Sequence, residues 1–117
     1  MNESIIYVFL GIIAFIAYKK YTHYKVLKQV PSLLEEGAQI VDVRTVDEFL
    51  VANKQNSINI PLDLLKDRTS ELDKTKPIIL CCASGSRSGL AKRVLISKGF
   101  VNVHNAGAWR ALTKFNY

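Results

Sequence analysis

The chain has 117 residues, which leaves room for one domain and little else. Its formal net charge is +6 and no acidic residue follows Asp73, so the C-terminal part would attract an anionic substrate or partner. Nucleic acid is not expected in that role, because no aromatic–basic interleaving or nucleic-acid-binding motif accompanies the charge. The two cysteines are adjacent and cannot form an ordinary disulfide framework, so nothing indicates an oxidising compartment.

The N-terminal segment, residues 4–18, is apolar and uncharged. As a helix it would cover about 22 Å, less than the roughly 30 Å hydrocarbon core of a bilayer. Flanking lysines and interfacial tyrosines extend the effective span. We therefore expect residues 1–20 to form a single transmembrane anchor and residues 21–117 to form one soluble domain. Two alternatives remain: a cleaved signal peptide, which should begin with basic residues, and a buried core helix, which would need a polar face.

The charges around this segment predict its orientation. Glu3 precedes the apolar run, whereas Lys19, Lys20, Lys25 and Lys28 follow it. Positive residues remain on the cytoplasmic side of a membrane, so the soluble domain is expected to face the cytoplasm. The lysines either contact anionic headgroups or form a solvated linker.

Strand and helix patterns alternate along the rest of the chain. Residues 31–37 resemble a short helix with an early Pro31 and a terminal Gly37. A buried strand is expected at 39–43, and Thr45 and Glu48 form a capping box for a helix at 46–52. The remaining expected elements are a strand-to-helix corner at 57–62, a surface helix within 62–72, a strand at 78–81, a helix from about 86 to 99, a strand at 101–105 and a helix at 108–114. This alternation predicts an α/β fold with a parallel sheet and helices on both faces.

A short loop of small polar residues follows the expected central strand. A strand, a tight loop and a helix start in that order direct several backbone N–H groups toward one point. A thiol at that point would be stabilised as the thiolate, and Arg87 would add positive charge. The loop therefore predicts a cysteine nucleophile beside an anion-binding cradle.

Either cysteine could be that nucleophile. Cys82 begins a C-x-x-G-x-R-S pattern that ends at Ser88, whereas Cys81 lies at the C-x5-R spacing of tyrosine phosphatases. The phosphatase pattern needs a histidine where Leu80 stands, and its glycine positions also fail. Successive strand residues face opposite sides, so only one thiol can face the loop. We expect Cys82 to be the nucleophile and Cys81 to be a small buried hydrophobic residue.

Three motifs together resemble those of single-domain rhodaneses, which are sulfurtransferases. They are the D-V-R-T-x-x-E-F segment from Asp42, the S-I-N-I-P-L corner from Ser57 and the loop from Cys82. The resemblance covers roughly residues 24–113 and implies the rhodanese fold, with a single parallel sheet of about five strands. One departure is the segment Ala52-Asn53-Lys54, where the family usually has Gly-His-Ile.

The resemblance also implies a reaction, in which Cys82 accepts sulfane sulfur from thiosulfate or a persulfide and passes it to a thiol, a protein or cyanide. Substrate binding would involve the loop residues Ala83, Ser84, Gly85, Ser86, Arg87 and Ser88. Asp42 and Arg44 are expected to form a supporting ion pair, and Trp109 is expected to pack in the core. Neither His23 nor His104 is expected to act as a general base, and no cofactor or metal site is expected.

Three other functions fit the same sequence. The first is a cysteine phosphatase or arsenate reductase that uses Cys81. The second is a non-catalytic rhodanese-like module that recruits a partner to the membrane. The third is a sulfur carrier that transfers persulfide to one partner without rapid thiosulfate turnover.

Overall fold

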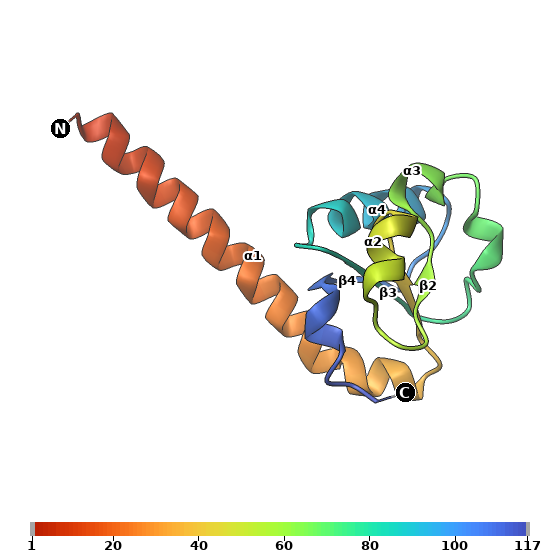
Figure 1. Cartoon of the computed structure of the whole chain (residues 1–117). Helices are drawn as coiled ribbons and strands as arrows, with labels where there is room; N and C mark the ends of the chain where they lie inside the picture. Colours follow the sequence, from red (N-terminus) through yellow and green to blue (C-terminus); the bar gives the residue numbers. More distant parts are fainter. Residues whose placement is uncertain (1, 117) are drawn as a thin grey trace.

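The computed structural model describes residues 2–116, so Met1 and Tyr117, at the outer ends of the two expected domains, lie outside the described residues. Figure 1 shows a long helix, α1 (Glu3–Glu35), that projects from an α/β unit containing the rest of the chain. The elements after α1 are β1 (Gln39–Asp42), α2 (Val46–Val51), β2 (Ile58–Asn59), α3 (Leu62–Leu65), the 3-10 helix η1 (Thr69–Glu71), β3 (Ile78–Cys82), α4 (Ser86–Ser97), β4 (Val103–Ala108) and the 3-10 helix η2 (Trp109–Leu112).

The strands form one parallel sheet in the order β2-β1-β3-β4. In the described chain the sheet has four strands where about five were expected, because the other segments form helices and turns. The α/β class and the parallel arrangement are confirmed. β3 is central, and its five residues are all buried.

The core has two parts, one on each face of the sheet, which confirms helices on both faces. One part joins Leu80 of β3 to Leu65 of α3 and Leu95 of α4. The other joins Ile79 of β3 to Val30 of α1 and Leu112 of η2. Neighbouring residues of β3 thus contribute to opposite layers, as strand geometry requires.

The lysine-rich segment after the apolar run is helical and continuous with it. The short helix expected at 31–37 is the last part of α1, and Pro31 lies inside this helix instead of near its start. Val30 and Leu33 are buried against the sheet and hold this part of the helix in place although Pro31 lacks an N–H donor. Gly37 follows the helix with a φ of +85°, the left-handed conformation that favours glycine. The expected boundary between residues 20 and 21 lies within α1.

Three other boundaries differ from the expectation. The segment 62–72 contains α3 and η1 as two short pieces, and not one helix. The last strand lies at Val103–Ala108, and the last helix is the single 3-10 turn η2. Asn105 is therefore inside β4, where its side chain contacts the loop after β3.

Candidate active site

The loop predicted to hold an anion connects the end of β3 to the start of α4. Cys82 is the last residue of β3, and Ser86 is the first residue of α4. Gly85 adopts a φ of +105° at the N-terminal end of α4. An L-residue rarely adopts this conformation, so glycine is required for the chain to turn here.

The Cys82 thiol is buried inside this turn. Its Sγ accepts a hydrogen bond from the Gly85 N–H at 2.9 Å and lies 3.4 Å from the Ser88 Oγ. Burial opposes the thiolate, but hydrogen bonds from Ser88 and from the backbone of Gly85 and Ser84 outweigh it, so the pKa of Cys82 lies below its usual value. The turn therefore favours the thiolate form of Cys82 over that of an unperturbed thiol.

A small hydrogen-bond network holds Ser88 in position. Its Oγ lies 2.6 Å from Asn105 Oδ1 and 3.1 Å from the Gly85 carbonyl oxygen. Asn105 Nδ2 donates to the same carbonyl at 3.2 Å, and its Oδ1 accepts from the Gly107 N–H at 2.9 Å. β4 thereby fixes both the loop and the hydroxyl beside the sulfur. Sequence reasoning missed Asn105, because its pairing depends on the sheet register.

Cys81 has the opposite environment. It lies in the core layer that contains Val30 and Trp109, whereas Cys82 lies in the layer that contains Leu95. Burial and the neighbouring Asp42 carboxylate raise the pKa of Cys81. The expectation that the two thiols face opposite sides is confirmed.

Arg87 is bound to a carboxylate. Its two terminal nitrogens donate to Glu48 Oε1 at 2.6 Å and to Glu48 Oε2 at 3.0 Å. The Arg87 hydrogen bonds and the Thr45 cap lower the pKa of Glu48 to about 2. Glu48 also accepts from the Thr45 N–H and Oγ1, which confirms the predicted capping box of α2. The pairing of α2 with the loop was not anticipated, although Glu48 belongs to the first motif.

Asp42 and Arg44 form a buried ion pair beside the site. The Arg44 Nη2 lies 2.8 Å from Asp42 Oδ2 and also donates to the Ala52 carbonyl oxygen at 2.8 Å. The guanidinium lies 4.6 Å from the ring centroid of Trp109, which is itself buried. These contacts join the end of β1 to α2 and η2, as a supporting role requires.

His23 of α1 lies against the loop between β3 and α4, which sequence reasoning did not predict. A Cβ atom at Gly85 would come within 2.6 Å of His23 Cε1, and one at Gly107 within 2.8 Å of His23 Nδ1. The imidazole therefore fills a space that two glycines leave open. Burial and the nearby Lys19 lower the pKa of His23. No pattern in the local sequence of His23 signals this contact.

The remaining loop residues face solvent. Ala83, Ser84 and Ser86 are exposed, whereas Gly85 and Ser88 are buried. The structure thus gathers Cys82, Gly85 and Ser88 around the sulfur and leaves the rim of the loop accessible. Within residues 2–116 no group of three or more His, Cys, Asp or Glu side chains is placed to hold a metal ion.

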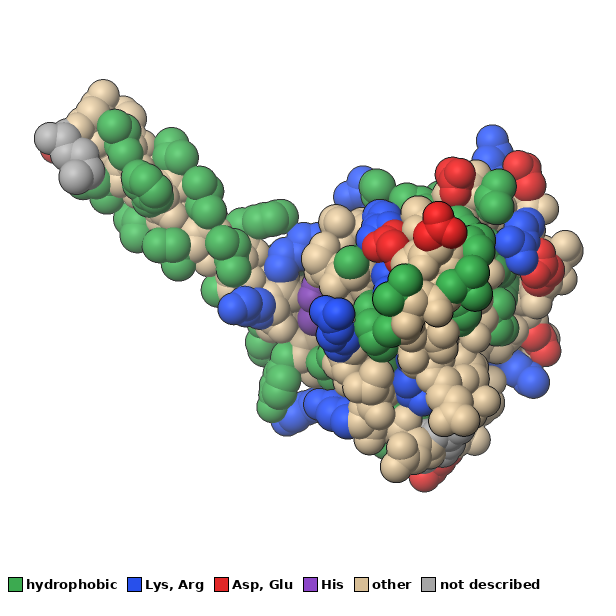
Figure 2. Space-filling model, viewed as in Figure 1, with side chains coloured by type: hydrophobic (Ala, Val, Ile, Leu, Met, Phe, Trp, Pro, Cys, Tyr) green, Lys and Arg blue, Asp and Glu red, His purple; other side chains and the backbone are tan. Residues whose placement is uncertain are grey.

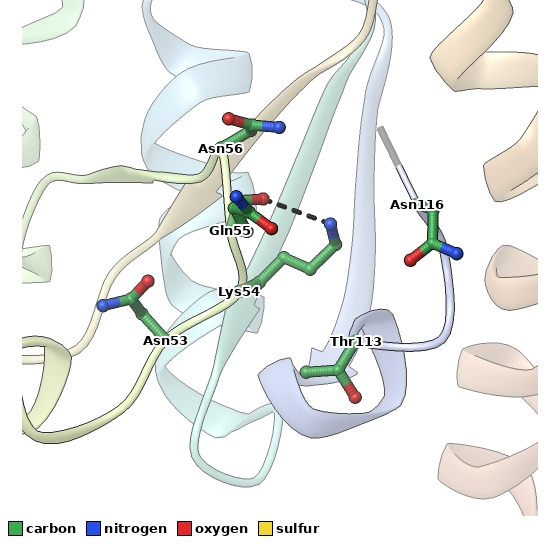
Figure 3. Close-up of a pocket in the computed structure, with 6 residues that line it drawn as sticks. All are labelled: Asn53, Lys54, Gln55, Asn56, Thr113 and Asn116. Atoms are coloured by element: carbon green, nitrogen blue, oxygen red, sulfur yellow. Dashed lines mark hydrogen bonds between the residues drawn. The ribbon is translucent and has the colours of Figure 1, made fainter.

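A cavity of about 340 Å³ lies elsewhere, at the segment that departs from the usual Gly-His-Ile pattern. Figure 3 shows Lys54 with its amine directed to the Gln55 carbonyl oxygen, at 3.1 Å. The described residues that line this cavity are Asn53, Lys54, Gln55, Asn56, Thr113 and Asn116. None of them belongs to the loop between β3 and α4.

Residues 26–113 match the rhodanese-like domain family. The chain belongs to this family. Among curated rhodaneses, it is 38% identical over 69 residues to the thiosulfate sulfurtransferase PspE of Escherichia coli, covering 57% of this chain and 66% of that protein. It is 30% identical to the thiosulfate sulfurtransferase GlpE of Pseudomonas savastanoi, and the match covers 72% of this chain and 83% of that protein. It is 35% identical to the putative sulfur carrier protein YrkF of Bacillus subtilis, and the match covers 61% of this chain and 38% of that protein.

Solved structures of rhodaneses agree with this assignment. A rhodanese with anions from E. coli is 34% identical, with a TM-score of 0.58 over 63% of this chain and 89% of that chain. A rhodanese-like domain protein from Staphylococcus aureus is 30% identical, with a TM-score of 0.62 over 73% of this chain and 85% of that chain. Both matches leave part of this chain uncovered, and the family match begins only at residue 26.

The first part of α1 has the composition of a membrane span. α1 is long and apolar enough to cross a bilayer, and none of its most apolar window is buried within the chain. Its exposed side chains include Ile6, Phe9, Ile13 and Phe15. Figure 2 shows this hydrophobic surface on the projecting helix, with Lys and Arg side chains where the helix meets the α/β unit.

Proposed function

We propose that this rhodanese is a membrane-anchored sulfurtransferase that carries sulfane sulfur on Cys82. The observation that supports this most directly is the placement of the Cys82 Sγ inside a turn whose N–H groups and Ser88 hydroxyl favour the thiolate. The homologues PspE and GlpE, which are named thiosulfate sulfurtransferases, support the same class of reaction.

In the first half-reaction, the Cys82 thiolate attacks the outer sulfur of thiosulfate. A new S–S bond forms to Cys82, the S–S bond of thiosulfate breaks, and sulfite leaves with the electron pair. With a persulfide donor, a thiolate leaves in place of sulfite. The Gly85 N–H that donates to Sγ is then placed beside the bound persulfide, where it favours negative charge.

In the second half-reaction, an acceptor nucleophile attacks the outer sulfur of the persulfide. The Cys82–sulfur bond breaks, and Cys82 recovers its electron pair as a thiolate. A thiol or protein acceptor becomes a persulfide, and cyanide becomes thiocyanate. Each half-reaction replaces one bond to sulfur by another, so no external oxidant or reductant is needed.

The experiment that tests this proposal is intact mass measurement after mild thiosulfate treatment. We expect the full chain to gain the mass of one sulfur atom, and we expect cyanide to remove it. The Cys82→Ser variant should gain nothing. A wild-type chain that gains no sulfur from either thiosulfate or a small persulfide would support the non-catalytic recruitment module instead.

The apolar half of α1 is proposed to anchor the chain, with the lysines that follow it on the cytoplasmic side. A phosphatase or arsenate reductase that uses Cys81 is not favoured, because this thiol is buried in the opposite core layer and its pKa is raised. The identity of the acceptor distinguishes the enzyme from a dedicated sulfur carrier, and both use the same Cys82 chemistry.

A further inference from the structure

A basic groove lies between α1 and α4, next to the catalytic loop. It has a volume of about 360 Å³, and its polar lining comes from Lys19, Thr22, His23, Lys92, Arg93 and Asn105. No carboxylate is among the described residues that line it. A groove with three permanent cations, hydrogen-bond donors and no negative charge is suited to an anion of more than one charge.

The sequence spacing explains why one helix contributes most of this groove. Thr22 and His23 follow Lys19 by three and four positions, and Val26 follows them by four and three, which places these residues on one face of α1. This face is turned toward the α/β unit, where Lys92 and Arg93 of α4 approach from the other side. Figure 2 shows Lys and Arg side chains on both sides of a histidine at this junction.

The position of the groove along α1 indicates where its ligand comes from. Tyr18, the last residue of the apolar run, also lines the groove, and Lys19 is the first charged residue after that run. If residues 4–18 lie in the hydrocarbon core, the groove lies at the level of the phospholipid headgroups. The anions available at that level are lipid phosphates, and each nearby lysine or arginine favours their binding.

We propose that this groove binds the phosphate of an anionic phospholipid and thereby holds α4 and the catalytic loop against the membrane surface. The proposal rests on the membrane-anchoring part of the proposed function and is independent of the sulfurtransferase reaction. It differs from a general attraction of lysines to the membrane, because it requires Lys92 and Arg93, which lie far from α1 in sequence.

Asn105 connects the groove to the reactive sulfur. It lines the groove, and its Oδ1 lies 2.6 Å from the Ser88 Oγ, which in turn lies 3.4 Å from the Cys82 Sγ. His23 also lines the groove and packs against Gly85 of the loop. A bound phosphate would therefore contact two residues that position the catalytic turn.

The test is native mass spectrometry of the full chain in neutral detergent with equimolar phosphatidylglycerol and phosphatidylcholine. We expect the chain to retain phosphatidylglycerol preferentially. The K92Q/R93Q variant should reduce this preference on the order of 10-fold, because two cations near the headgroup are removed. The matched control K74Q/K98Q removes two exposed lysines outside the groove and should retain the wild-type preference.

Three results would overturn the proposal. Equal losses in both double variants would mean that only net charge attracts the lipid. Displacement of the lipid by millimolar inorganic phosphate would assign the groove to soluble phosphates instead. No preference in the wild type would also reject it. Flotation of the full chain with pure phosphatidylcholine vesicles tests the anchor separately, and a urea unfolding curve like that of the wild type shows that K92Q/R93Q is folded.

Discussion

The guanidinium of Arg87 is held by the carboxylate of Glu48 through two hydrogen bonds, at 2.6 and 3.0 Å. The loop arginine, expected from the sequence to meet the substrate anion, therefore has a negatively charged partner already. The pair joins α2 to the start of α4, and both side chains are partly exposed. Glu48 thus reduces the positive charge that Arg87 can offer to an incoming thiosulfate.

We expect Arg87→Ala to lower kcat/KM for thiosulfate by about 10-fold, because a dianion must approach a thiolate with less compensating charge. The loss should be smaller for a neutral persulfide donor, and the pKa of Cys82 should rise. Arg87→Lys should recover part of the activity at low salt. Steady-state kinetics with both donors checks this, and equal losses with an unchanged pKa of Cys82 would show that Arg87 only shapes the loop.

Glu48→Gln should have the opposite effect on thiosulfate. Glutamine can still cap α2, but it leaves the charge of Arg87 uncompensated. We expect KM for thiosulfate to fall by about 2- to 5-fold at low salt. Glu71→Gln is the matched control, since it breaks a similar exposed pair with Arg68 and should leave KM unchanged. A rise in KM for Glu48→Gln alone would mean that the pair is needed to position Arg87.

The two cysteines should respond differently to substitution. Cys82→Ser should abolish sulfurtransfer and the persulfide mass, because the nucleophile is removed. Cys81→Ser should retain most of the activity and lose some stability, because a buried thiol is replaced by a hydroxyl. Thiosulfate turnover and urea unfolding measure the two effects. Release of p-nitrophenol from its phosphate ester that is lost in Cys81→Ser but not in Cys82→Ser would favour the phosphatase that uses Cys81.

The reaction of Cys82 with iodoacetamide should follow a pH profile whose midpoint lies below that of an unperturbed thiol. Between the native pKa of Cys82 and the pKa of the unfolded thiol, the unfolded state binds more protons than the native state. Native stability therefore rises with pH in that window and is lost as pH falls through the native pKa. Ser88→Ala should move the midpoint upward, because it removes the hydroxyl beside Sγ. Ser97→Ala, which alters an exposed hydroxyl on the same helix, should not.

Truncation tests whether residues 1–20 are an anchor separate from the rest of the chain. A chain that begins at residue 21 should be soluble and retain sulfurtransfer, whereas one that begins at residue 26 lacks His23 and should lose activity several-fold because Gly85 loses its packing partner. His23→Ala in the full chain should lower activity in the same direction, and His104→Ala is the control. If the chain from residue 21 aggregates, the apolar run is part of the fold and no membrane anchor exists.

The sequence predicted the parts of the site that follow from neighbouring residues. The alternation along β3 separated Cys81 from Cys82, and the spacing of Thr45 and Glu48 located a real capping box. The partners Asn105, Glu48 and His23 could not be predicted, because each reaches the loop from a different element. The sequence predicts a separate helix from Pro31, whereas α1 is continuous through this residue. The difference arises because local propensity does not include the burial of Val30 and Leu33 on the sheet.

Under the proposed function, the unbroken course of α1 limits which molecules could receive sulfur from this protein. His23 follows Tyr18 by only five positions, a rise of about 8 Å along the helix axis. If the apolar part crosses a bilayer, a continuous helix holds the loop after β3 at the level of the headgroups, without a flexible tether. An acceptor protein must then lie on or in the same membrane, or present its thiol on an extended segment. Such an acceptor would reach Cys82 largely by diffusion in the plane of the membrane.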